Sequence, residues 1–337
     1  MVMSSSEIAP PWMYCHGHWR RSLAFLAMGA CVAMTAASLW DMQVTAALIR
    51  WSQPDFNTIM GRTLFEGHLP GANDFSAIIW IAALVIYIGG SLKRNQTNRL
   101  ARFRPQAGFV LASALIIALS MVHGLKYFVG RARPSLVLDE AWPYSLWFVF
   151  GPHTIAQGPF NASFPSGHTA QAFTLMSIAY LLAGNPLASK TQKRLGWLWG
   201  GLALLFTMAM GIARCASQNH WLTDVMGSIC LGWLLMHWIY FGLLRVPDQH
   251  RHWAEHNRPP QLPWGWELML CLDIFLIIAG AIMIAGSLRG VLGTGTLWHA
   301  WLIPSGAALI WVGARLFRLN RRSVSQALGQ AQKEEKP

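Results

Sequence analysis

Eight long apolar runs dominate this chain of 337 residues and most constrain what it can fold into. About 20 residues of helix cross the roughly 30 Å hydrocarbon core of a bilayer, and each run comes close to that length. Only 12% of the residues are charged, against about 25% in an average soluble domain. The sequence therefore predicts an all-α polytopic integral membrane protein. Its expected helices are 22–40, 75–92, 107–125, 167–183, 195–213, 221–243, 267–286 and 298–317.

Basic residues alternate between the two sides that these helices define. Most of the 26 lysines and arginines fall just before the first run, in the loops 93–104, 190–194 and 245–258, or in the tail from Arg315. The positive-inside rule places such segments in the cytoplasm. We therefore expect a protein of the cytoplasmic membrane with both termini inside. Its cytoplasmic parts would be 1–21, the loop 244–266 and the tail 318–337.

The first apolar run also allows interpretation as a cleavable signal sequence, because Arg20 and Arg21 precede it and small residues follow it. A retained anchor is favoured, since the run is longer than a usual signal core. The five cysteines are dispersed and indicate neither a disulfide framework nor a zinc site. The net charge of +12 lies at the expected membrane faces, so it does not predict nucleic-acid binding.

Three short polar stretches interrupt this pattern on the expected outer side. "KYFVGRARP", with Lys126 and Arg133, follows the third helix, and "FPSGH" opens the fourth. "ARCASQNHWLTD" joins the fifth helix to the sixth and carries Arg214, His220 and Asp224. Successive helices that cross a membrane return each of these stretches to one level of the bilayer. The sequence therefore predicts that they meet in one site.

The residue types in these stretches suit the binding of a phosphoryl group. Guanidinium and ammonium groups bind phosphate oxygens and stabilise the charge that spreads over them during transfer. We expect Lys126, Arg133 and Arg214 to act in this way. Backbone N–H groups at a helix start bind anions; Gly167 would allow close approach, and Ser166 would add a hydroxyl.

Two histidines and an aspartate can supply the covalent chemistry. His220 and Asp224 are four residues apart at a helix start and therefore share a face, so the carboxylate can orient the ring for attack on phosphorus. His168 would protonate the leaving oxygen and then activate water. No cluster of carboxylates accompanies these residues, so we expect no catalytic magnesium and no other cofactor.

The three stretches resemble the signatures of the type 2 phosphatidic acid phosphatase family, the membrane branch of the superfamily that includes vanadium haloperoxidases and bacterial class A acid phosphatases. The family pattern is Lys, six residues, Arg-Pro; Pro-Ser-Gly-His; and Ser-Arg, five residues, His, three residues, Asp. This chain departs from it at Ala213, where the family usually has Ser. The resemblance implies a six-helix core, here 22–243, with a phosphohistidine at His220. The hairpin 267–317 lies outside that core.

The sequence thus predicts hydrolysis of a terminal phosphate of a membrane lipid, bound from the bilayer at the outer face. A lipid-to-lipid phosphotransferase is the alternative, because a phosphohistidine can discharge to water or to a second lipid. A vanadium haloperoxidase and a non-catalytic anion-binding protein or transporter are further alternatives. The motifs bind only the phosphate, so they predict neither the rest of the lipid nor the oligomeric state.

Four other features have two interpretations each. Arg131 is expected to meet lipid headgroups rather than the phosphate. The aromatic loop 135–164 is either a lid or an interfacial segment without a catalytic role. Asp273, a carboxylate within an apolar helix, is either functional or a packing residue. The histidines of "DQHRHWAEH" are expected in a solvated loop rather than a metal site.

Overall fold

The computed structural model describes residues 19–64, 66, 70–92, 99–149, 162–257, 265–294 and 297–333. Every regular element in these ranges is helical, which confirms the expected all-α class. Seven helical segments in the described ranges are long and apolar enough to cross a membrane, with mean hydropathy from 1.3 to 2.7. Their outer faces are apolar; for example, Val32 is 70% exposed and Val85 is 65% exposed. Such a surface is stable against lipid rather than against water.

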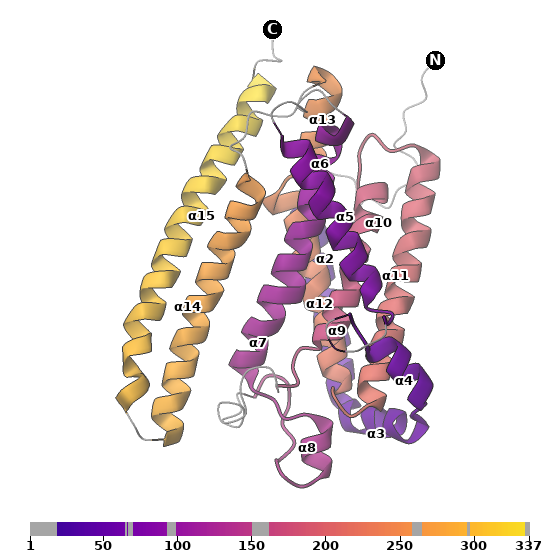
Figure 1. Ribbon diagram of the computed structural model, residues 1–337, viewed down its shortest axis with the longest axis vertical. Helices are drawn as coiled ribbons and strands as arrows, with labels where there is room; N and C mark the ends of the chain where they lie inside the picture. Colours follow the sequence, from indigo (N-terminus) through magenta and orange to yellow (C-terminus); the bar gives the residue numbers. More distant parts are fainter. Residues whose placement is uncertain are drawn as a thin grey trace.

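The first half of the chain crosses the bundle three times (Figure 1). Two short helices, α3 and α4, and the single turn of α8 lie together at the lower end of the view. A π-helical stretch, η2, joins α6 to α7 within the third crossing. The bounds of these elements are α2 (Trp19–Leu39), α3 (Asp41–Trp51), α4 (Pro54–Gly61), α5 (Asp74–Ser91), α6 (Arg99–Ser113), η2 (Ala114–Met121), α7 (Val122–Val129) and α8 (Pro134–Leu138).

The fourth expected helix, 167–183, is two short helices rather than one. α9 (Gly167–Phe173) is followed by Thr174, whose hydroxyl donates to the carbonyl of Gln171 at 2.7 Å. α10 (Met176–Ala183) begins after Leu175, whose carbonyl accepts from the indole of Trp199 at 2.9 Å. Side chains therefore satisfy the polar groups at this break in an otherwise apolar region. The break carries no proline or glycine, so the sequence did not indicate it.

The second half of the chain adds two core elements and a hairpin. Part of the expected loop 244–266 is helical. The histidines of "DQHRHWAEH" lie in this helix, α13. The prediction of a loop there was therefore wrong. The elements are α11 (Lys190–Ala216), α12 (Leu222–His237), η4 (Trp238–Leu243, π-helical), α13 (Val246–His256), α14 (Trp266–Thr294), η5 (Leu297–Trp301) and α15 (Leu302–Lys333).

The C-terminal hairpin α14–α15 packs through small residues. A Cβ atom added to Gly280 would lie 2.4 Å from the carbonyl oxygen of Gly306, so glycine is required where the two helices cross. Asn320 on α15 donates to Asp273 on α14 at 2.7 Å, and Asp273 is only 2% exposed. The hydrogen bond from Asn320 thus supports the interpretation of Asp273 as a packing residue between the two helices. α14 also contacts the core, where a side chain at Gly286 would meet Tyr127.

The two ends of the bundle differ in their residues. Trp19, Arg20, Arg245 and Arg321 line one small cavity, so the start of α2, the start of α13 and the last part of α15 share an end. The three polar stretches lie at the opposite end, near α3, α4 and α8 (Figure 1). The fold thus separates a basic end from the end that carries the candidate site.

Candidate active site

The three polar stretches converge because backbone hydrogen bonds join them. The N–H of Ser163, just before "FPSGH", donates to the carbonyl of Arg131 in the first stretch at 2.8 Å. The N–H of Ser166 donates to the carbonyl of Asp224 in the third stretch at 3.1 Å. Each bond joins segments that are more than 30 residues apart. The site is therefore held by main chain as well as by side chains.

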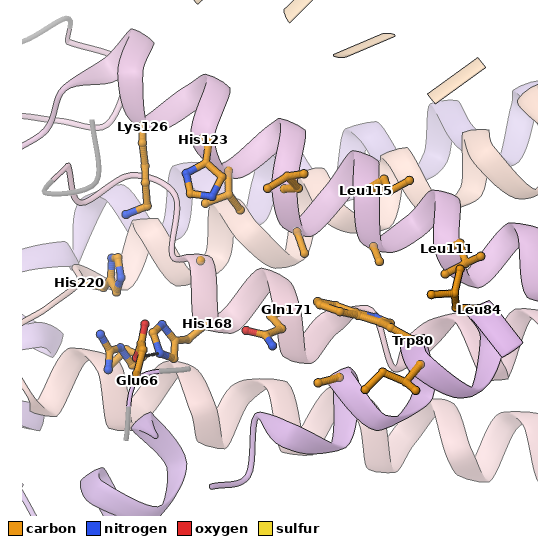
Figure 2. A pocket seen from close by; sticks show the side chains of 18 of the residues that line it. Glu66, Trp80, Leu84, Leu111, Leu115, His123, Lys126, His168, Gln171 and His220 are labelled. Carbon is orange, nitrogen blue, oxygen red and sulfur yellow. Dashed lines mark hydrogen bonds and ion pairs between the residues drawn. The ribbon is translucent and has the colours of Figure 1, made fainter. Parts of the chain in front are cut away.

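A cavity of about 1020 Å³ opens where the stretches meet. Charged and polar side chains line one end of it, as Figure 2 shows for Lys126, His168 and His220. Asp224 lies behind His220 and does not line the cavity, and neither does Ser166. The expected site residues that do line it are Lys126, Arg133, Gly167, His168, Arg214 and His220.

His220 and Asp224 form a buried pair just before and within the start of α12. Nδ1 of His220 lies 3.6 Å from Oδ2 of Asp224, somewhat longer than a hydrogen bond. The side chains are 2% and 0% exposed. Burial lowers the pKa of His220 to about 3, because the charged imidazolium would lose its hydration. The ring is therefore neutral, and His220 lines the cavity.

The carboxylate of Asp224 is fixed by donors on both oxygens. Oδ1 accepts from the guanidinium of Arg131 at 2.8 Å. Oδ2 accepts from the N–H of Trp221 at 2.7 Å and also from the hydroxyl of Ser163. A carboxylate held by several donors cannot rotate, so its direction toward His220 is set by the surrounding chain.

Arg131 is placed differently from the sequence expectation. Its side chain is 0% exposed and therefore does not reach lipid headgroups. It does not line the cavity either. The guanidinium instead pairs with Asp224 and with Asp41 on α3, at 2.8 and 2.6 Å. The prediction of headgroup contact was wrong because the partner that buries this arginine lies 90 residues earlier in the chain.

Three cations line the polar end of the cavity. Lys126 on α7 is 5% exposed and donates to the carbonyl of Ala162 at 2.5 Å. Arg133, just before α8, donates to the side chain of Asn219 at 3.2 Å. Arg214, near the end of α11, has no hydrogen-bond partner for Nε in the part of the chain that the structure describes. These positive groups leave the cavity suited to an anion with several oxygens.

His168, the second residue of α9, has a carboxylate partner that the sequence did not suggest. Its Nε2 lies 2.8 Å from Oε2 of Glu66, which is 54% exposed. The hydrogen bond with His168 lowers the pKa of Glu66. Asp74 holds this part of the chain, since its two oxygens accept from the N–H groups of Leu64 and Gly71 at 2.6 and 2.7 Å. His168 and His220, the two expected catalytic histidines, thus each face a carboxylate.

Ser166 and Gly167 stand at the start of α9. Ser166 is 0% exposed, and its Oγ accepts from the N–H and the hydroxyl of Thr169 at 3.4 and 2.8 Å. It therefore serves as the N-cap of the helix, and its expected contact with phosphate stays a prediction. Gly167 lines the cavity, and its missing side chain leaves backbone facing the ligand space.

The part of the chain that carries this arrangement is similar to a known protein family. Residues 107–245 match the PAP2 superfamily. These residues form a PAP2 domain. The family expected from the three stretches is thereby confirmed, and all eight expected site residues, from Lys126 to Asp224, fall within the matched range.

Two curated proteins are similar to the chain. Phosphatidylglycerophosphatase B of Bacillus subtilis (strain 168) is 26% identical over 217 residues, which cover 63% of this chain and 88% of that protein. Lipid A 1-phosphatase of Porphyromonas gingivalis is 26% identical over 194 residues, which cover 56% of this chain and 36% of that protein. The chain thus spans little more than a third of the second relative. No solved structure gave a significant match.

Beyond the polar end, the cavity of the PAP2 domain continues as an apolar arm between α5 and the α6–η2–α7 crossing (Figure 2). Trp80 and Leu84 on α5 face Leu111 and Leu115 across it. Leu84 is 44% exposed and Leu115 is 36% exposed, so the arm also opens to the outside of the bundle. Leu268 of α14 completes its lining, so the hairpin outside the PAP2 domain contributes to the cavity.

The structure describes residues 135–149 and 162–164 of the aromatic loop 135–164. Tyr144 packs against the ring of Trp221 with centroids 4.9 Å apart, and Trp147 stacks on Phe164 at 5.5 Å. Phe148 is 55% exposed. Phe150 lies outside the described residues. Part of the loop thus packs against the site, while a role as a lid stays a prediction.

Two acidic residues outside the PAP2 domain were missed at the sequence level. Asp41 follows the first apolar run directly, and Glu66 lies before the second run. Both belong to the expected outer side, which carries other acidic residues such as Asp55 and Asp139, so no signal in the sequence singled them out. His252 and His256 of α13 stack at 4.3 Å. No group of three possible metal ligands gathers within the described ranges.

Proposed function

We propose that this membrane protein removes the terminal phosphate of a membrane lipid through a phosphohistidine at His220. Its class, a phosphoric monoester hydrolase that acts on lipid phosphates, rests on the PAP2 domain and on relatives named as lipid phosphatases. The observation that carries the finer proposal is the single cavity in which a cationic end continues into an apolar arm. Such a cavity matches a molecule with a phosphate at one end and a hydrocarbon chain at the other.

In the first step, the cavity-facing nitrogen of neutral His220 attacks phosphorus. The bond from phosphorus to the lipid oxygen breaks, and His168 donates a proton to that oxygen, so the lipid leaves as an alcohol or, from a pyrophosphate, as a shorter phosphate. Asp224 stabilises the positive charge that develops on the ring of His220. The low pKa of His220 supports this role, because only the neutral ring has a lone pair to donate.

In the second step, water attacks the phosphorus of the phosphohistidine. His168, now neutral, accepts the proton of that water, and the nitrogen–phosphorus bond breaks. Inorganic phosphate and the starting form of His220 result. Glu66 would stabilise His168 whenever the ring is protonated, because the two groups lie at 2.8 Å.

Lys126, Arg133 and Arg214 would bind the non-bridging oxygens throughout. Their charge stabilises the transition state in which negative charge spreads over those oxygens. Gly61 supports this arrangement, because a Cβ atom there would lie 3.1 Å from a terminal nitrogen of Arg214. The chain thus leaves room for the guanidinium beside the end of α4.

The lipid would reach the site sideways, between α5 and η2, where the apolar arm opens to the outside of the bundle. The basic residues that line the small cavity at the other end support a cytoplasmic position for that end. The candidate site would then face the outer side of the cytoplasmic membrane. Both ends of the chain would lie inside.

Phosphate release by the purified protein in detergent tests the proposal. The panel contains phosphatidic acid, phosphatidylglycerol phosphate, undecaprenyl pyrophosphate and lipid A, each with a labelled phosphate. His220→Ala is measured beside His256→Ala on α13, a matched control that removes a histidine at the opposite end of the bundle. Release of free phosphate by the native protein and by the control, but not by His220→Ala, supports hydrolysis. Label on an added second lipid instead would establish the phosphotransferase alternative, and no product from any lipid would refute the proposal.

A further inference from the structure

We propose that Arg131 and Asp41 form a positioning pair that aims Asp224, and through it His220, at the phosphorus atom. The inference rests on the proposed function but concerns residues outside the three signature patterns. Asp41 lies outside the PAP2 domain, and Arg131 is one of the unspecified positions between Lys126 and Arg133. Neither side chain lines the cavity, so neither would touch the substrate.

Arg131 is surrounded on all sides by groups that define its position. Nε donates to the carbonyl of Ser145 at 2.8 Å, and one terminal nitrogen donates to both Asp224 and the hydroxyl of Thr223. The other terminal nitrogen donates to Asp41 at 2.6 Å. The rings of Tyr144 and Trp221 lie 5.4 and 5.3 Å from the guanidinium carbon. A planar fork held in this way can direct a carboxylate as a flexible ammonium group would not.

Asp41 completes the arrangement from α3. Its Oδ2 accepts from Arg131, from Tyr144 at 3.0 Å and from the hydroxyl of Thr223 at 2.9 Å. Its Oδ1 accepts from the N–H of Thr223 at 2.8 Å. Asp41 is only 1% exposed. Two of the four hydrogen bonds that this carboxylate accepts therefore come from Thr223, which precedes Asp224 in the chain.

α3 thus contacts the start of the catalytic helix α12 at two successive turns. Thr45, one turn after Asp41, accepts from the N–H of Leu222 at 3.1 Å. Together the two side chains receive the N–H groups of the first two residues of α12, which otherwise have no partner within a helix. A change in Asp41 would be transmitted to Asp224 through both the backbone and Arg131.

The distance between His220 and Asp224 explains why Arg131 and Asp41 are needed to hold Asp224 in position. His220 and Asp224 lie 3.6 Å apart, so a small rotation of the imidazole, or of a carboxylate that has lost its donors, decides whether they form a hydrogen bond. Arg131 also supplies the positive charge that offsets a carboxylate in a fully buried place. Loss of the Arg131–Asp41 pair would therefore slow the chemical step and leave the binding of phosphate unchanged.

The test uses the full chain in detergent, with the lipid of the panel that the native protein hydrolyses fastest. The variants are Asp41→Asn, Arg131→Lys, Arg131→Gln and the double variant Asp41→Asn with Arg131→Gln. Arg50→Gln is the matched control, because Arg50 is an exposed residue of the same helix α3. For each protein, kcat, KM and the inhibition constant of vanadate are measured, with thermal unfolding as the check on folding.

The expected result for Asp41→Asn and Arg131→Gln is a fall in kcat of about 10- to 100-fold, the range seen for groups that orient catalytic ligands. KM and the inhibition constant of vanadate should stay within about twofold of native values. Arg131→Lys should retain part of the lost activity. The double variant should be little worse than Arg131→Gln, because the two residues act through one chain of contacts.

Three results would overturn the inference. Vanadate binding that weakens in parallel with kcat would make Arg131 a ligand of the anion. Unchanged kcat in both single variants would leave the pair without influence, and losses that multiply in the double variant would make the residues independent. If Arg131→Gln does not fold, kcat of the isosteric Asp41→Asn decides alone. A native protein that releases no phosphate from any lipid would count against the proposed function instead.

Discussion

The two histidine–carboxylate pairs of the site differ in almost every physical respect. His220 and Asp224 are buried, lie within 3.6 Å and are held by a network that reaches Arg131 and Asp41. His168 and Glu66 lie at 2.8 Å, but the Glu66 side chain is 54% exposed and comes from a loop. Burial and fixed partners keep the geometry of His220 and Asp224 constant and the ring of His220 neutral. His168 and Glu66 are open to solvent and can exchange protons with water.

This difference matches the two tasks that the chemistry requires. A nucleophile needs a free lone pair and a constant direction, which burial and fixed partners provide. An acid that becomes a base must gain and lose a proton in each cycle, which contact with solvent favours. The two pairs should therefore respond differently to mutation and to pH.

Removal of the nucleophile should have the largest effect. We expect His220→Ala to lose on the order of 10⁴- to 10⁶-fold in kcat, as when an enzyme loses a group that forms the covalent intermediate. Helix content from circular dichroism should stay at the native level. A variant with more than about a tenth of native activity would show that the buried pair is not the nucleophilic one.

Replacement of the acid should have a smaller effect that depends on the leaving group. We expect His168→Ala to lose about 10²- to 10⁴-fold in kcat for a lipid alcohol, which is the usual contribution of acid–base catalysis. For an aryl phosphate ester the first step needs no proton, so formation of the phosphoenzyme should be far less affected. Rapid-quench kinetics with both substrates measures this. An equal loss of phosphoenzyme formation for both leaving groups would contradict the assignment.

The pKa of the nucleophile gives a prediction about pH. Burial lowers the pKa of His220 to about 3, whereas a free histidine has a pKa of about 6.5. A lowered pKa means that the ring stays neutral as the pH falls from 8 to about 5. Histidine-labelled NMR spectra in detergent, with His220→Gln to assign the signal, should therefore show no titration of this ring in that range. A midpoint near 6.5 would show that the pair is hydrated.

The exposed carboxylate should matter least. We expect Glu66→Gln to lower kcat by about two- to fivefold, because exposed ion pairs contribute only about 0.2–1 kcal/mol. Asp74→Asn, which loosens the segment that carries Glu66, should have a similar effect through the same contact. The measurement is kcat at low ionic strength for both variants. An effect as large as that of His168→Ala would make Glu66 a member of the catalytic group.

The membrane fold could be predicted from the sequence because long apolar runs have one solution in a bilayer. Seven of the eight expected spans correspond to continuous helical segments. The break at Thr174 and Leu175 could not be predicted, since it depends on Trp199, which approaches only after folding. The helices α3 and α4 were missed as well, because they are too short to give a membrane signal.

The candidate site was predictable to the extent that its residues lie in short motifs. Lys126, His168 and His220 line one cavity, as the hairpin topology implied. Arg131 could not be placed from the sequence, because its position depends on Asp41, which is far away in the chain. Contacts between distant segments set the position of residues such as Glu66, and one sequence does not reveal them.

The proposed covalent intermediate on His220 can be tested by trapping it. Native protein and His220→Asn would be mixed with a lipid that carries a radiolabelled phosphate and quenched within milliseconds in base. We expect a label on the native protein that is stable in base, labile in acid and located on the peptide that contains His220, with none on the variant. Rapid phosphate release with no protein-bound label, or a label that persists in His220→Asn, would contradict it.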